Sequence, residues 1–185
     1  MAIKPILFNT EMVLAILDGR KTCTRRTLKH PFIVHPNGYI TKPRGNENLC
    51  PYDSPYQRGD ILYVRETWKN APNGYYYYEN WQRDDIADVT KWKPSIHMPK
   101  EAARIWLKVT NVRVERLQDI TADSIRNEGL SSLAVHCGDM EIALKEWENL
   151  WNSTIKKSDL DRYGWDANPW VWVIEFERCE KPKGV

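Results

Sequence analysis

Residues 19–26 read Gly-Arg-Lys-Thr-Cys-Thr-Arg-Arg and place four cations within seven positions. The run directly follows a predicted helix at 10–18, whose apolar residues from Val13 to Leu17 recur at helical spacing. Gly19 is a typical residue just beyond a helix end, so the cationic run starts from a fixed point. On composition alone such a segment is most often a solvated basic turn. The residue types within it also allow a second interpretation, in which the run belongs to a reactive site.

Three features of this run point to chemistry. Lys21 is crowded by Arg20, Arg25 and Arg26, and neighbouring positive charge disfavours the charged amine and lowers its pKa. Thr24 lies three residues after Lys21, so on a turn or at a helix start the amine can approach the hydroxyl and act as the base for a Thr nucleophile. The arginines offer forked donors for a phosphate or an oxyanion. Because Lys-x-x-Thr is common by chance, the run needs support from elsewhere in the chain.

The rest of the chain predicts an α+β fold. Residues 61–68 and 170–176 are rich in β-branched and aromatic residues and are predicted as strands, and the alternating residues 104–117 as one long bent strand or two. Helices are predicted at 121–128, which begins at a capping Thr, and at 139–152, which is amphipathic. The order helix, strands, helices, strand indicates a mostly antiparallel or mixed sheet.

Two long segments carry no sustained hydrophobic period. Residues 30–58 are predicted as a loop with a hairpin at Asn37-Gly38. Residues 69–100 are predicted as irregular chain with a short strand at Tyr75–Tyr78.

Composition excludes several classes of protein. The 185 residues carry a net charge of +2 and contain no stretch approaching the ~20 apolar residues of a membrane span, so we expect a cytoplasmic protein without a membrane partner. Residues 1–45 carry +6 and the remainder −4, which favours an anionic or phosphate-bearing partner for the N-terminal third. Nothing in the sequence indicates the oligomeric state.

Aromatic residues and cysteines add two further expectations. Nine Trp and nine Tyr stand against three Phe, and such rings either fill a core or stack on bases and sugars. The four cysteines form no Cys-x-x-Cys pair and no histidine lies at zinc-binding spacing, so no metal site and no cofactor is expected.

Three separated motifs occur together in this chain. They read Gly-Arg-Lys-Thr-x-Thr-x-Arg at 19–26, Gly-Asp-Ile-Leu-x-Val-x-Glu-x-Trp at 59–68 and Val-Ile-Glu-Phe at 173–176. In combination they resemble the ASCH domain family. The resemblance implies a PUA-like fold, a small β-barrel with flanking helices, as a single domain over residues 1–185. Residues 92–99, Trp-Lys-Pro-Ser-Ile-His-Met-Pro, are similar to ASCH proteins of phages and prophages.

The resemblance also implies an activity. One small bacterial branch of the family is an amidohydrolase that converts N4-acetylcytidine to cytidine and acetate with a Lys and a Thr of the same motif and a Glu from a later helix. Carried over to this chain, the catalytic residues are Lys21, Thr24 and Glu128. Glu66, in the predicted strand at 61–68, is a rival carboxylate.

The substrate-binding residues follow from the same resemblance. Arg26 is expected to stabilise an oxyanion, and a ring is expected to stack on the base. The expected set is Arg20, Arg25, Arg26, Tyr63, Glu66 and Trp68. The expected partner is a modified nucleoside or single-stranded RNA. Two long insertions, roughly 30–57 and 69–103, distinguish this chain from the small hydrolase, and they can roof the site and change its substrate.

Two other functions remain open at this point. A non-catalytic RNA-binding module would use the same basic run on phosphates and the rings on bases. A ribonuclease acting on single-stranded RNA would use a carboxylate and a Lys to promote attack by the 2′-hydroxyl. The hydrolase predicts a small closed pocket, whereas the binding module predicts an open basic groove whose affinity falls steeply as salt rises.

Overall fold

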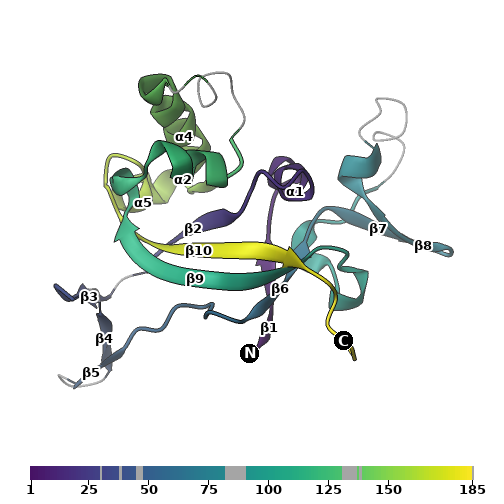
Figure 1. The fold of residues 1–185 in the computed structure, drawn as a ribbon, viewed down its shortest axis with the longest axis horizontal. Helices are drawn as coiled ribbons and strands as arrows, with labels where there is room; N and C mark the ends of the chain where they lie inside the picture. Colours follow the sequence, from purple (N-terminus) through teal and green to yellow (C-terminus); the bar gives the residue numbers. More distant parts are fainter. Residues whose placement is uncertain are drawn as a thin grey trace.

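A central five-stranded sheet crosses the middle of Figure 1. The computed structural model describes residues 1–29, 31–37, 39–44, 48–81, 91–130, 137 and 139–184. The strand order is β1-β6-β9-β10-β2, with β1 and β6 parallel and the other neighbours antiparallel. The strands are β1 (Ile3–Leu7), β2 (Cys23–Thr27), β6 (Ile61–Arg65), β9 (Trp106–Arg116) and β10 (Trp170–Cys179). The predicted α+β class with a mixed sheet is confirmed.

β1 is an edge strand that the sequence does not predict. Its residues, Ile-Lys-Pro-Ile-Leu, include Pro5, which has no N–H to donate and is therefore confined to edges. The strand is short and its alternation is interrupted by that proline. Its structure is determined by its pairing with the strongly apolar β6. That pairing begins with Ile3 opposite Ile61.

The basic run at 19–26 forms the opposite edge of the sheet. Its second half is β2, which pairs antiparallel with β10 over five residue pairs. The turn predicted for this run is therefore wrong, because pairing with a buried central strand overrides the local preference of a polar segment.

The sheet curls, but its two edges do not pair. Within the described ranges no backbone pairing joins β1 to β2, so the β-barrel implied by the resemblance is not closed. A side chain spans this seam instead, because Arg26 Nη2 of β2 donates to the Leu7 carbonyl at the end of β1 at 3.1 Å.

α1 (Thr10–Leu17) connects the two edge strands and agrees with the predicted helix. The Asn9 side chain caps it by accepting a hydrogen bond from the Met12 amide. Gly19 follows with a φ of 74°, a conformation that favours glycine and ends the helix.

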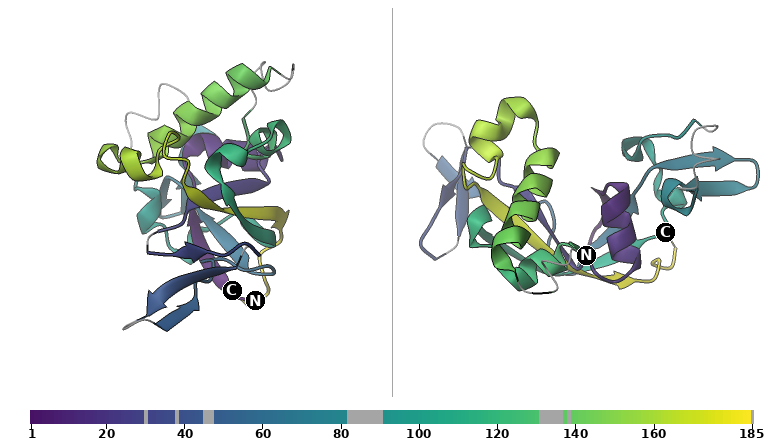
Figure 2. Two further views of the ribbon diagram at one scale, coloured as in Figure 1. Left: turned by 90° about the vertical axis from the view of Figure 1, so that its left-hand side faces the viewer. Right: turned by 90° about the horizontal axis from the view of Figure 1, so that it is seen from above.

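Three further helices lie over one end of the sheet in Figure 1, away from the hairpin of β7 (Trp68–Ala71) and β8 (Gly74–Tyr77). α2 (Ala122–Asn127) is capped by Thr121, and α4 (Met140–Thr154) is capped by Asp139. α5 (Leu160–Tyr163) follows α4, and Figure 2 shows it beside the end of that long helix. Both predicted helices in this region are therefore confirmed, with shifted ends.

Two small sheets flank the main one. They contain β3 (Ile33–Val34), β4 (Ile40–Arg44) and β5 (Asn48–Pro51) on one side and β7 (Trp68–Ala71) and β8 (Gly74–Tyr77) on the other. The predicted hairpin is found as β3–β4, although its turn residue Gly38 lies outside the described residues. The predicted strand at 61–68 ends at Arg65, and Trp68 begins β7. Short 3₁₀ turns lie at Tyr78–Trp81, Ser95–His97, Lys100–Ala102, Leu117–Asp119 and Lys157–Asp159.

Hydrophobic clusters lie on either side of the curled sheet, and the burial of their apolar surface stabilises the fold. One cluster packs α1 against one face, around Ile16 and Ile174. A second packs α2 and α4 against the other face, around Trp147 and Val173. A third surrounds Trp106 at the β7–β8 end.

Candidate functional site

The basic run meets the end of α2 across the edge of the sheet. Lys21 and Glu128 form an isolated antiparallel bridge, and the Thr22 amide donates to the Asn127 carbonyl at 2.8 Å. Gly129 makes this approach possible, because a Cβ there would lie 2.8 Å from Ala15 Cβ and 3.0 Å from Lys21 Cβ. The close approach brings the Glu128 side chain against Lys21.

Lys21 and Glu128 form a buried ion pair. Lys21 Nζ donates to Glu128 Oε2 at 2.7 Å and to the Glu128 carbonyl at 2.8 Å. The side chains are only 2% and 4% exposed. Arg25 Nη1 donates to the other carboxylate oxygen, Oε1, at 3.0 Å. Each Glu128 oxygen therefore has its own cation, which is the condition for keeping a charge in the interior.

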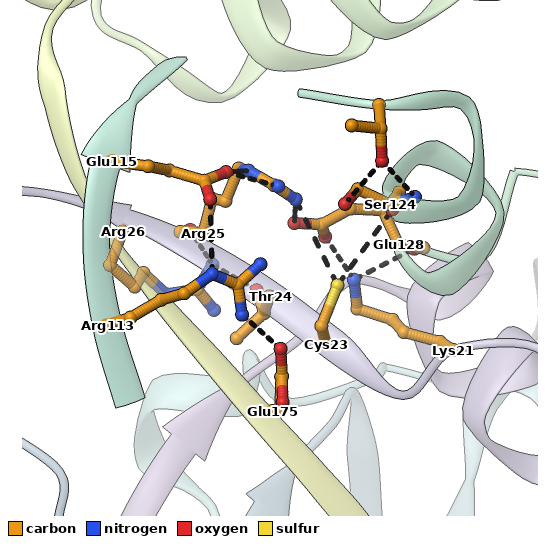
Figure 3. Close-up of polar contacts among 11 residues, drawn as sticks. Lys21, Cys23, Thr24, Arg25, Arg26, Arg113, Glu115, Ser124, Glu128 and Glu175 are labelled. Atoms are coloured by element: carbon orange, nitrogen blue, oxygen red, sulfur yellow. Dashed lines mark hydrogen bonds and ion pairs between the residues drawn. The ribbon is translucent and has the colours of Figure 1, made fainter. Parts of the chain in front are cut away.

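The ion pair is one end of an alternating chain of charges, drawn in Figure 3. Arg25 also donates to Glu115 Oε1, from Nε at 3.0 Å and from Nη2 at 2.5 Å. Glu115 in turn pairs with Arg113 at 3.2 Å, and Arg113 pairs with Glu175. Burial alone lowers the pKa of Arg25, but Glu128 and Glu115 outweigh it and the pKa is raised. Three cations and three carboxylates thus balance one another.

Thr24 and Arg26 form a separate pair beside this chain. Thr24 is 2% exposed, and its Oγ1 accepts a hydrogen bond from Arg26 Nη1 at 3.0 Å. No hydrogen bond joins Lys21 to Thr24 within the described structure. The turn or helix start that was expected to bring them together does not form, because Thr24 lies in β2 and Lys21 precedes that strand in an isolated bridge to Glu128.

Arg26 differs from the other cations of the motif because no carboxylate pairs with it in the described part of the chain. Its guanidinium lies 5.5 Å from the centroid of the Phe8 ring. Burial lowers its pKa, and Glu128 and Tyr56 partly offset that effect. An arginine remains charged even so, so uncompensated positive charge lies next to the Thr24 hydroxyl.

These groups line one small cavity of about 70 Å³. Its polar lining residues are Asn9, Lys21, Thr24, Arg25, Arg26, Glu128 and Thr154. Its apolar wall comes from Phe8 and Met12 and from α4, through Trp147, Leu150 and Trp151. The amphipathic period of the predicted helix at 139–152 places these rings on a buried face, but nothing in the sequence assigns that face to the basic run.

Three predicted substrate-binding residues lie elsewhere. Glu66 is 1% exposed and accepts two hydrogen bonds from Arg104 at 3.0 Å each. Burial raises the pKa of Glu66, and Arg104 only partly counteracts that rise. Tyr63 and Trp68 belong to the cluster around Trp106, with 8% and 5% exposure, and are core residues instead of exposed stacking rings.

Arg20 also lies outside the cavity lining. Its Nη1 donates to the Gly129 carbonyl at 2.5 Å, and its Nη2 pairs with Asp18 at 2.9 Å. The Arg20 side chain therefore links the end of α1 to the chain just after α2, and this contact forms a junction beside the site.

The two predicted insertions do not supply walls to this cavity. Among the described residues of 30–57 and 69–103, none lines it. The described residues of these segments therefore do not roof the site, because α1 and α4 occupy that position.

The described residues contain no group of three or more His, Cys, Asp or Glu placed to hold a metal ion. None of their helices has the length and apolar character needed to cross a membrane.

Comparisons with known proteins give a similarity of fold only. No family model matches the sequence, and no curated protein matches it. Two solved structures are similar. One is the hypothetical protein PH0355, with a TM-score of 0.41, 14% identity, and coverage of 97% of this chain and 100% of that one. The other, with a TM-score of 0.43, 12% identity, and coverage of 96% of this chain and 79% of that one, is an ASCH domain from Lactobacillus crispatus JV V101.

Proposed function

We propose that the Lys21–Thr24–Glu128 cavity is the active site of an amidohydrolase that removes a short acyl group from a modified nucleobase, as in N4-acetylcytidine. The observation that carries the proposal is a buried lysine–carboxylate pair in the same cavity as a hydroxyl bound by an unpaired arginine. That combination offers an acid–base pair, a nucleophile and a donor for developing negative charge.

The size of the cavity favours a small reacting group. Its volume of about 70 Å³ corresponds to roughly two water molecules, whereas pockets for whole ligands usually hold about 300 Å³ or more. An acetyl group fits such a space and a complete nucleoside does not. The base would therefore stay at the mouth, near Phe8 and Trp147, with only its acyl group inside.

The reaction would begin within the ion pair. Transfer of a proton from Lys21 Nζ to Glu128 Oε2, along the 2.7 Å hydrogen bond, leaves a neutral amine. That amine accepts the Thr24 hydroxyl proton as Oγ1 attacks the acyl carbon, with a shift of the bound acyl group or the side chains closing the gap between them. The new C–O bond converts the carbonyl oxygen to an oxyanion, and Arg26 is the nearest cation without a carboxylate partner.

Collapse of this intermediate breaks the C–N bond. The departing base amine takes the proton held by Lys21, and the acyl group remains on Thr24 as an ester. Water then attacks the ester and loses its proton to the Lys21 amine, which passes that proton to the departing Thr24 oxygen. The carboxylic acid and the Thr24 hydroxyl are formed in this way, and Glu128 returns its proton to Lys21. Atoms and protons balance without a metal ion or redox cofactor.

The rival functions need cations that are free to meet a polymer. Arg25 is 2% exposed and saturated by two carboxylates, and Arg20 is bonded to Asp18 and Gly129. A binding groove or a ribonuclease centre built on these arginines would first have to break those pairs. For this reason the hydrolase is favoured over both.

Acetate release from N4-acetylcytidine tests the proposal. We expect activity in the parent and a loss of at least about a hundredfold in Thr24→Ala and Glu128→Gln. Glu66→Gln is the matched control, because it alters an equally buried carboxylate that lies outside the cavity. If Thr24→Ala releases acetate as fast as the parent, or if Glu66→Gln is the inactive variant, the proposed site is wrong.

A further inference from the structure

A second, larger cavity lies where α5 faces the ends of β9 and β10. Its volume is about 410 Å³, within the range of small-molecule sites. The residues that give it chemical character are Arg116, Arg162, Tyr163, Trp170 and Phe32. No acidic residue is among the described residues that line it, and neither the motifs nor the composition of the sequence point to it.

The two arginines of this cavity have donors to spare. Arg116 spends one N–H on the Asn168 carbonyl at 3.0 Å, out of the five that a guanidinium carries. Arg162 is exposed and makes no hydrogen bond or ion pair within the described residues. The basic run was expected to supply such free arginine donors. Apart from Arg26 it cannot do so, because its other cations are already paired with carboxylates. The cavity is therefore suited to an anion such as a phosphate.

Aromatic faces accompany the positive charge. Trp170 is half-buried, and the Arg116 guanidinium lies 4.4 Å from its ring centroid. Tyr163 and Phe32 are half-buried and line the same space. Proteins that bind single-stranded nucleic acids combine arginine donors, which contact the phosphates, with planar rings, on which the bases stack.

Ala167 and Pro169 line the cavity, and hydrogen bonds of the intervening Asn168 hold this part of its wall in place. Asn168 adopts a φ of 43°, and its Oδ1 accepts a hydrogen bond from the Gln118 amide at 2.9 Å. Gln118 Nε2 donates to the Trp165 carbonyl at 2.9 Å. A preformed wall reduces the entropy lost when a ligand binds.

This cavity shares structure with the Lys21 cavity. Trp151 lines the first cavity, and its Nε1 donates at 2.8 Å to the carbonyl of Tyr163, which lines the second. Leu28 follows β2 directly, lines the second cavity and donates its amide to the Trp170 carbonyl at 3.0 Å. Figure 1 shows α4 and α5 over the same end of the sheet as β2.

We propose that the Arg116–Arg162 cavity binds a nucleotide, with its phosphate on the two arginines and its base against Trp170 or Tyr163. The inference rests on the proposed function in one respect, because it makes the substrate of the Lys21 cavity a single-stranded RNA whose neighbouring nucleotide occupies the second cavity. A free nucleotide offers the same chemistry, and the experiment separates the two sources.

Binding is measured first, in the Thr24→Ala background, so that hydrolysis plays no part. We expect cytidine 5′-monophosphate to bind at least about tenfold more tightly than cytidine, and Arg162→Ala to remove that difference. Lys108→Ala is the control, because it removes an exposed cation elsewhere on β9. Equal affinity for the two ligands, or an equal effect of Lys108→Ala, overturns the inference.

Hydrolysis is measured second, with free N4-acetylcytidine and with a trinucleotide that contains it. Arg162→Ala should lower kcat/KM for the trinucleotide about tenfold and leave the free nucleoside unchanged. Equal rates on both substrates in the parent overturn the RNA assignment. If the parent hydrolyses neither substrate while the phosphate-dependent binding persists, the cavity stands and the proposed function alone is wrong.

Discussion

Cys23 lies inside the basic motif, yet it is not a nucleophile. Burial raises the pKa of its thiol to about 12, with Glu128 adding to the rise and with Lys21 and Arg25 opposing it. The thiol is therefore protonated at neutral pH, and its sulfur lies 3.9 Å from the Ser124 carbonyl. Arg25 Nη1 donates to this sulfur at 4.0 Å, but the raised pKa keeps the thiol neutral, whereas the Thr24 hydroxyl is bound by Arg26, a cation that can stabilise negative charge.

The raised pKa of Cys23 predicts that the free energy of unfolding falls at alkaline pH. The unfolded thiol loses its proton near its ordinary pKa of 9.0 and the folded one only near 12, so the unfolded state binds fewer protons between these values and stability falls as pH rises. We expect Cys23→Ala to lose about 1.5 kcal/mol less stability than the parent between pH 9 and pH 10.5. Urea unfolding at both pH values measures this, and parallel losses would contradict it.

Arg25 is the residue on which the internal charges depend. Its removal leaves Glu115 and Glu128, whose side chains are only 16% and 4% exposed, with one cation fewer. We expect Arg25→Met to lower the free energy of unfolding by about 3–5 kcal/mol. Arg20→Ala, at the half-exposed junction, should cost about 1 kcal/mol or less. Urea unfolding followed by circular dichroism compares them, and similar losses in both would show that the network is not stabilising.

At the scale of elements, local signals predict the helices better than they predict the edge strands. Thr121 and Asp139 cap α2 and α4, and the apolar period of α4 faces the sheet as expected. β1 contains a proline, and four of the five residues of β2 are polar. The structure of both strands depends on partners that are distant in the sequence. No local signal can reveal such pairing.

The candidate site follows the same rule. The motif indicates Lys21 and Thr24, but the contact between Lys21 and Glu128 joins residues 107 positions apart and depends on Gly129. Only the family resemblance could suggest that partner. Tyr63 and Trp68 show the reverse case, because aromatic residues on strands are as consistent with a core as with a stacking surface, and the structure buries both.

Arg104 attaches the β7–β8 segment to the main sheet. It pairs with Glu66, just after β6, and with Glu79 in the turn after β8, and both carboxylates are 1% exposed at their side chains. We expect Arg104→Met to destabilise the fold by about 3–5 kcal/mol, since it leaves two buried carboxylates without a cation. The pKa of Glu66 is already raised, so the loss should shrink as pH falls from 7 to 5 and that carboxyl takes a proton.

Matched variants test this account of Arg104. Adding Glu66→Gln and Glu79→Gln to Arg104→Met should recover much of the lost stability, because the buried charges are then gone. Thermal unfolding at pH 7 and pH 5 measures both effects. A triple variant no more stable than Arg104→Met would mean that packing of the guanidinium on the Tyr77 ring, 4.1 Å away, is the main contribution.

For the whole molecule, the net charge of +2 conceals where the free cations are. The excess charge of residues 1–45 suggests a basic binding face, but within the motif Lys21 and Arg25 pair with the buried Glu128, and Arg25 also pairs with Glu115. Arg20 pairs with the exposed Asp18. Of the cations that line the two cavities, Arg26, Arg116 and Arg162 have no carboxylate partner among the described residues. The single-domain arrangement over residues 1–185 remains a prediction.

This distribution of charge predicts how binding depends on salt. If a short single-stranded RNA binds through the Arg116–Arg162 cavity, about two phosphate contacts form, and log K should fall with log salt at a slope near −1.4. Fluorescence titration of Thr24→Ala from low to physiological salt measures the slope, and Arg162→Ala should reduce it by about 0.7. A slope steeper than about −3, unchanged by Arg162→Ala, would require an extended basic groove. Because the ion pairs of the motif would then have to open on binding, that result would favour the RNA-binding module over the hydrolase.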